Sequence, residues 1–221
     1  MTYNSTLPKV FVYLLTTIET LYQTSVPLEV QNRKNVHLAT SDCLVIACYL
    51  WGVLHFSETL KAKHQLAQSL FPNFLEYSRF VRRCNALLPS IQVIRQALVF
   101  KEVEGISVSI IDSFPIPLCQ PIRNFRSKVL GDMGYLGQSL HDRLELKGID
   151  LITPDMKQKK ILFPNFSKGR KVIERIFSFL TNLGAERCKS RSPQGFQLKL
   201  EMILLAYSLM LKQINHWNHR L

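Results

Sequence analysis

The sequence predicts an α-rich α/β protein, with a helical amino-terminal region over residues 1–104 and an α/β region over residues 105–221. In the first hundred residues, apolar side chains recur at three- and four-residue spacing, which is typical of amphipathic helices. From residue 106 on, short β-branched segments bounded by Gly or Pro alternate with helical segments, as strands and helices do in α/β domains. The chain is 47% hydrophobic, which is enough to bury a core and excludes a wholly disordered protein.

Five helices are predicted in the helical region. Pro27 and the polar segment 31–34 end the first one, whose apolar face is formed by Val10, Leu14, Ile18 and Leu21. Thr40 or Ser41 caps a second, strongly apolar helix that runs to about Leu54. The third is expected over residues 57–70.

The fourth helix, over residues 74–88, carries three arginines that are expected on its exposed side, namely Arg79, Arg82 and Arg83. Pro89 is expected to stop it, and a fifth helix follows over 91–101. Three consecutive short helices with a basic last member favour a helix-turn-helix that contacts DNA. The alternative is a small helical bundle whose surface arginines have no such role.

In the second region the order of elements is mixed. Strands are expected over residues 106–111, 128–130 and 149–153, and helices over 136–146, 172–180 and 193–217. Asp112 directly follows the first strand, and Asp132 lies in a glycine turn after the second. A carboxylate at the end of a strand can hold a metal ion or cap the following turn, so residue type alone leaves both roles open.

The formal net charge is +12, with most of the excess in the second region. Residues 106–221 contain 18 basic and 9 acidic side chains, against 10 and 7 in residues 1–105. Because neutralising phosphates releases condensed counterions, a polyanion is the expected partner, and a merely solvated basic face is the alternative. The predicted phosphate contacts in this region are Lys168, Arg170, Lys171 and Arg175.

The sequence predicts no membrane partner. The longest apolar run, residues 43–56, is shorter than the roughly 18–20 residues that span a bilayer, and polar residues follow Met1 where a secretory signal would be apolar. The five cysteines form an odd set without a C-x-x-C pair, which favours a reducing compartment. A cytoplasmic protein is expected.

Four motifs in the second region occur in a characteristic order: DSFPIPLC at 112–119, GDMGY at 131–135, LITP at 151–154 and RKVIERIFS at 170–178. The basic segment FVRR at 80–83 precedes them. This ordered set resembles the DDE transposases of bacterial insertion sequences. The resemblance implies a ribonuclease H-like catalytic domain over residues 105–221 that cleaves DNA and transfers strands in transposition. It also implies element-end and target DNA as partners and a nucleoid-associated location, and leaves a homo-oligomer on DNA open.

By this resemblance, Asp112, Asp132 and Glu174 are the catalytic residues and hold two Mg²⁺ ions, for which Mn²⁺ can substitute. Two-metal sites promote in-line displacement at phosphorus, and Mg²⁺ prefers oxygen ligands such as these carboxylates. Arg170 lies four residues before Glu174, hence on the same helix face, where it can contact a phosphate beside the metals. The alternative is that Glu174 pairs with Arg170 or Lys171 on an exposed helix.

The spacing of the first two carboxylates departs from the family pattern. Asp112 and Asp132 are 20 residues apart (132 − 112), whereas family members have a much longer segment with further strands and a helix. A single crossover alone takes at least about 10–12 residues, so we predict an internal deletion near 126–130 and a truncated catalytic domain. Ser167 and Thr181 also stand where a related transposase group has Tyr and Lys.

Three functions follow from these observations. The first is an insertion-sequence transposase with metal-dependent activity, and the second is a catalytically dead remnant that still binds DNA. The third is a basic helical protein that binds RNA or a protein partner.

Overall fold

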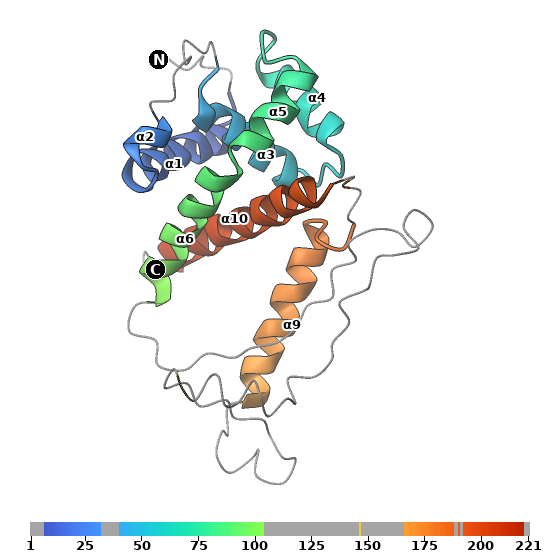
Figure 1. The fold of residues 1–221 in the computed structure, drawn as a ribbon. Coiled ribbons are helices and arrows are strands. Elements are labelled where there is room, and N and C mark those ends of the chain that lie inside the picture. Colours follow the sequence, from blue (N-terminus) through green and yellow to red (C-terminus); the bar gives the residue numbers. More distant parts are fainter. Residues whose placement is uncertain are drawn as a thin grey trace. The chain divides into compact units, whose positions relative to one another are not determined.

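The structure is a computed structural model that describes residues 7–31, 40–103, 146, 166–187, 190 and 192–218. These residues form helices, and no strand occurs among them (Figure 1). The chain divides into two units. The first combines Met1–Ile106 with Leu180–Leu221, and the second is Ser107–Phe179.

The first helix, α1 (Lys9–Ser25), confirms the predicted amphipathic helix. Its buried face includes Leu14, Ile18 and Leu21, as expected, but Val10 is 59% exposed and Phe11 is buried in its place. The helix ends before Pro27, whose carbonyl then accepts the first backbone bonds of the short helix α2 (Leu28–Gln31).

Helix α3 (Asp42–Leu54) lies at the centre of the first unit. The Ser41 hydroxyl accepts a hydrogen bond from the Leu44 N–H at 3.1 Å, which confirms the predicted cap. Buried residues continue without a break from Val45 to Val53, because α1, α4, α5 and α10 all pack against this helix.

The next three helices are α4 (Leu60–Leu70), α5 (Tyr77–Ala86) and α6 (Leu88–Val103). Helix α4 begins three residues later than predicted, because Thr59 caps it and accepts the Ala62 N–H. The prediction that Pro89 stops a helix is wrong: Pro89 lies in the first turn of α6. The missing N–H of a proline has no intrahelical partner there, so the residue is tolerated.

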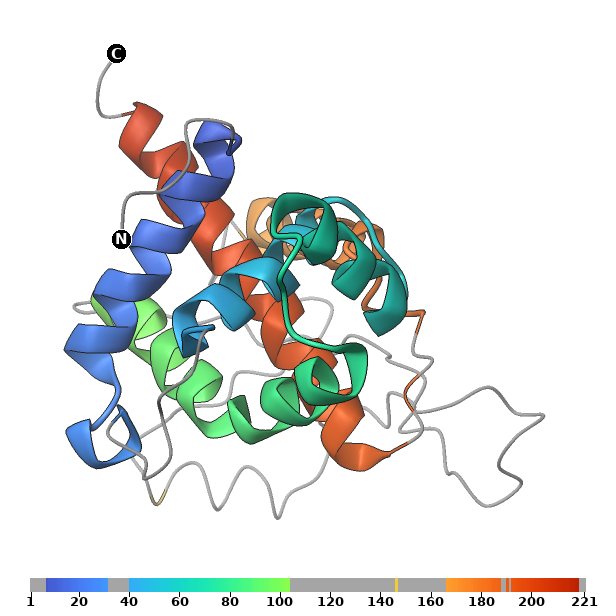
Figure 2. The same ribbon diagram turned by 90° about the horizontal axis from the view of Figure 1, so that it is seen from above.

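The last helix, α10 (Pro193–Asn218), confirms the prediction of a long core helix. Figures 1 and 2 show it running alongside α6, and it also packs against α3. Leu198, Met202 and Ile203 are fully buried in this contact. Glu201 accepts a hydrogen bond from Arg95 Nε of α6 at 2.5 Å. The core of the first unit is therefore built from both ends of the chain.

The predicted strands at 106–111, 128–130 and 149–153 lie outside the described residues. So does the predicted helix at 136–146, apart from Leu146, an exposed turn residue. The ribonuclease H-like sheet and the domain division at residue 104 therefore stay predictions.

Candidate functional site

Of the three predicted metal-binding carboxylates, the structure describes Glu174. It lies on α9 (Phe166–Asn182), and its side chain is exposed. Asp112 and Asp132 lie outside the described residues. Within the described part of the chain, no three His, Cys, Asp or Glu side chains gather as a metal site. The convergence of the three carboxylates stays a prediction.

Helix α9 presents a charged stripe around Glu174. Lys171, Glu174, Arg175 and Ser178 are all exposed, and their spacing of three and four residues places them on one face. Towards the end of the same helix, Leu180 is buried. Lys168 and Arg170 belong to the same helix, and the backbone puts Arg170 one turn before Glu174. The stripe combines one carboxylate with basic groups, an arrangement that suits a phosphate bound beside a cation.

Two of the three arginines of helix α5 are exposed, and the third is largely buried in an ion pair. Arg79 and Arg82 are exposed, as predicted. The expected exposure of Arg83 is wrong, because its side chain is 15% exposed and its Nη2 lies 2.6 Å from Asp42 Oδ1. Packing of α5 on α3 brings this guanidinium over the amino-terminal end of α3, where the carboxylate pairs with it.

Helices α3, α4 and α5 pack pairwise against one another. Phe80 and Cys84 of α5 point into this cluster and are buried, which leaves Arg79 and Arg82 on the outer side. The segment between α4 and α5 covers residues 71–76, longer than the 3–4-residue turn of a helix-turn-helix. The cluster supports a basic outer face on α5, while its contact with DNA stays a prediction.

A small cationic pocket was missed in the sequence. Lys63, Lys199 and Arg187 line a cavity of about 50 Å³ in the first unit, together with Glu58. Lys63 belongs to a predicted helix, but a lysine at helical spacing normally indicates an exposed position. Nothing in the local pattern of α4 signals its burial, which depends on Gly52 of the neighbouring helix α3. A Cβ atom at residue 52 would clash with the Lys63 side chain and lie 3.2 Å from its Cα.

Residues 116–209 match a family model described as "Transposase DDE domain". This match confirms the predicted resemblance to DDE transposases and supports a transposase-type function. It contains Asp132, Glu174 and most of α10, and it begins four residues after Asp112. No curated protein and no solved structure matches the chain. Over the described residues, no helix is long and apolar enough to cross a membrane.

Proposed function

We propose that this chain, which is similar to DDE transposases over residues 116–209, derives from an insertion-sequence transposase, binds DNA and has lost strand transfer. The observation that carries the proposal is the family match, because it includes two of the three expected carboxylates, Asp132 and Glu174. Because transposases act on DNA, the proposed partner is DNA and the proposed location is the bacterial cytoplasm at the nucleoid.

The exposed stripe on α9 supports phosphate binding. Lys171 and Arg175 flank Glu174 on the same face, and both side chains are exposed. A net charge of +12 adds a general attraction for polyanions. Lys168 and Arg170 extend the basic sequence by a further turn of the same helix. These residues would follow the DNA backbone without reading its sequence.

The donor set suits a divalent metal. Asp112, Asp132 and Glu174 would hold Mg²⁺ through hard carboxylate oxygens, and the side chain of Glu174 is exposed. When bound, the metal supplies activation of the attacking oxygen and neutralisation of charge at phosphorus. Arg170, one turn before Glu174, would orient the phosphate beside the carboxylates.

The short connector is the reason to expect lost activity. Asp112 and Asp132 are only 20 positions apart, which is too few for the strands and helix that support the site in longer relatives. A sheet without these strands exposes apolar faces and unpaired backbone groups. A displacement of ~1 Å at the reacting groups can reduce the rate on the order of 10²-fold.

A strand-transfer assay with duplex DNA that carries the sequences flanking the gene tests this proposal. With Mg²⁺ or Mn²⁺, the purified chain should bind this DNA and show no transfer. Insertion of a longer relative's connector between Asp112 and Asp132 should restore cleavage, and Asp132→Ala in the restored protein should abolish it. Metal-dependent transfer by the 221-residue chain, lost on Asp112→Ala, would contradict the proposed inactivity.

The DNA-binding part is tested separately by salt dependence. The double change Lys171→Gln and Arg175→Gln should weaken duplex binding and reduce the slope of log K against log salt by about 1.8, or ~0.9 for each phosphate that is no longer neutralised. Lys9→Gln with Lys61→Gln is the matched control, because both lysines are exposed and the charge change is equal. Equal effects of the two double variants would show that α9 makes no specific phosphate contact.

A further inference from the structure

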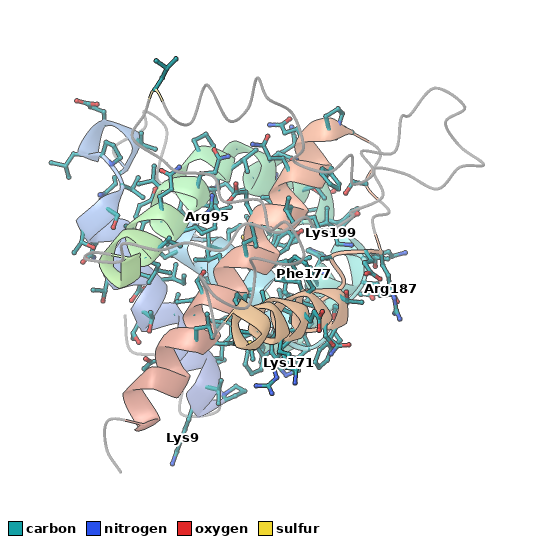
Figure 3. All side chains as sticks on the ribbon, turned by 90° about the horizontal axis from the view of Figure 1, so that it is seen from below. Lys9, Arg95, Lys171, Phe177, Arg187 and Lys199 are labelled. Atoms are coloured by element: carbon teal, nitrogen blue, oxygen red, sulfur yellow. The ribbon has the colours of Figure 1, made fainter. Side chains whose placement is uncertain are left out.

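The cationic pocket of the first unit gathers charges from elements that are distant in sequence. Lys63 comes from α4, Lys199 from α10 and Arg187 from the segment after α9; Figure 3 labels the latter two. Glu58 is the one carboxylate among the residues that line it. The cavity of about 50 Å³ is several times larger than the ~10–15 Å³ that one water molecule needs. The pocket is thus large enough for a small polyatomic anion.

Lys63 is the most unusual of the three cations that line the pocket, because it is buried, with only 4% of its surface exposed. Its Nζ donates a hydrogen bond to the Ser57 carbonyl and lies 5.5 Å from the centroid of the Tyr49 ring. The pKa of Lys63 is lowered to about 8, mainly by burial and then by the charge of Lys199, while Glu58 acts in the opposite direction. An ammonium in this position gains stability from a nearby anion.

The other two cations are held at the rim of the cavity. Arg187 Nη1 donates to Glu58 Oε1 at 2.6 Å, and the Arg187 side chain is 69% exposed. Lys199 Nζ donates to the Arg187 carbonyl, so the α10 side chain reaches across to the segment after α9. Among the residues that line the cavity, three are cations and one is a carboxylate, so the lining carries a formal charge of +2.

We propose that this pocket binds a single phosphate group through Lys63, Lys199 and Arg187. A phosphate dianion matches the excess charge, and its oxygens accept from ammonium and guanidinium donors. The group can belong to a DNA backbone or to free inorganic phosphate, and the chemistry of recognition is the same. The proposal does not depend on strand transfer or on the α9 stripe.

Thermal unfolding of the full chain in sodium phosphate, with NaCl at equal ionic strength as reference, tests the free-phosphate source. The wild type should show a rise in Tm that grows with the logarithm of the phosphate concentration and reaches about 3–6 °C at ten times the Kd. Lys199→Gln and Arg187→Gln should each lose most of this rise. Lys61→Gln, an exposed position in α4 that does not line the cavity, should keep it. Arg187 and Glu58 form an exposed ion pair, so Arg187→Gln should change the phosphate-free Tm only a little, and the rise of each variant is measured from its own phosphate-free Tm.

Duplex binding by the same variants tests the DNA source. If a backbone phosphate occupies the pocket, Arg187→Gln with Lys199→Gln should weaken binding about tenfold or more, and Lys9→Gln with Lys61→Gln much less. Lost phosphate stabilisation with unchanged duplex affinity would assign the pocket to free phosphate. The proposal is overturned if the pocket variants equal their controls in both measurements. The double change Lys171→Gln and Arg175→Gln on α9 tests the proposed function separately, because neither residue lines the pocket.

Discussion

The guanidinium Nη2 of Arg83 in α5 lies 2.6 Å from the carboxylate Oδ1 of Asp42 in α3. Arg83 Nε donates to the same oxygen at 2.7 Å, and Nη2 donates to the Thr40 carbonyl at 3.3 Å. The Tyr22 hydroxyl of α1 donates to Asp42 Oδ2 at 3.0 Å. This network joins three helices around one half-buried carboxylate, which assigns Arg83 to the fold and leaves Arg79 and Arg82 as the exposed arginines of α5.

Arg83→Gln should lower the free energy of unfolding by about 1–3 kcal/mol, because it removes charged hydrogen bonds and leaves Asp42 half-buried without its cation. Urea denaturation measures the loss. Arg82→Gln, one position away and exposed, should stay within about 0.5 kcal/mol of wild type. A double-mutant cycle with Asp42→Asn should show coupling between the two sites, and strict additivity would refute the pair.

Arg79→Gln with Arg82→Gln should weaken duplex DNA binding and leave unfolding unchanged, since both side chains are exposed. If each contacts one phosphate, the salt slope should fall by about 1.8. Binding isotherms between ~50 and 200 mM salt measure it, with Lys9→Gln and Lys61→Gln as the charge-matched control. A slope equal to that of the control would exclude α5 from the DNA interface.

Glu201→Ala should lower the free energy of unfolding by about 2–3 kcal/mol. The change leaves the Arg95 guanidinium, 23% exposed, without its carboxylate between α6 and α10. It also removes the acceptor of Gln92 Nε2, at 3.4 Å. Gln197→Ala, at an exposed position of α10, is the control and should have little effect. Equal losses in urea denaturation would contradict a stabilising role for the pair.

The lowered pKa of Lys63 predicts that the stability of the protein depends on pH. Its pKa is about 8 in the folded chain and 10.5 when unperturbed, so between these values the unfolded chain binds more protons. Stability from this group therefore rises with pH in that window. In phosphate-free buffer, the unfolding free energy of wild type relative to Lys63→Met should increase by about 2–3 kcal/mol from pH 7.5 to 10.5.

The comparison with Lys63→Met isolates the lysine. The buried thiols Cys48 and Cys84, whose pKa values burial raises, act equally in both proteins. A free-energy difference that is constant over this pH range would show that Lys63 is not held as a buried ammonium.

Features that depend on residues close together in the sequence could be predicted from the sequence alone. The bounds of α1 and α3 follow from apolar spacing, from the Ser41 cap and from Pro27, all within a few residues of the helix ends. The order of the motifs around Glu174 indicates the similarity to DDE transposases, because motifs are read along the chain. These signals are local, and the backbone hydrogen bonds that they specify are local as well.

Only the tertiary structure determines which charged side chains are buried. Arg83 and Asp42 are 41 positions apart, and Arg95 and Glu201 are 106 apart. Lys63 is buried because Gly52 of α3 lets α4 approach closely, and Lys199 reaches the same pocket from the other end of the sequence. Spacing within one helix separates an apolar from a polar face, but a charged side chain becomes buried only when a distant helix supplies its partner and excludes water.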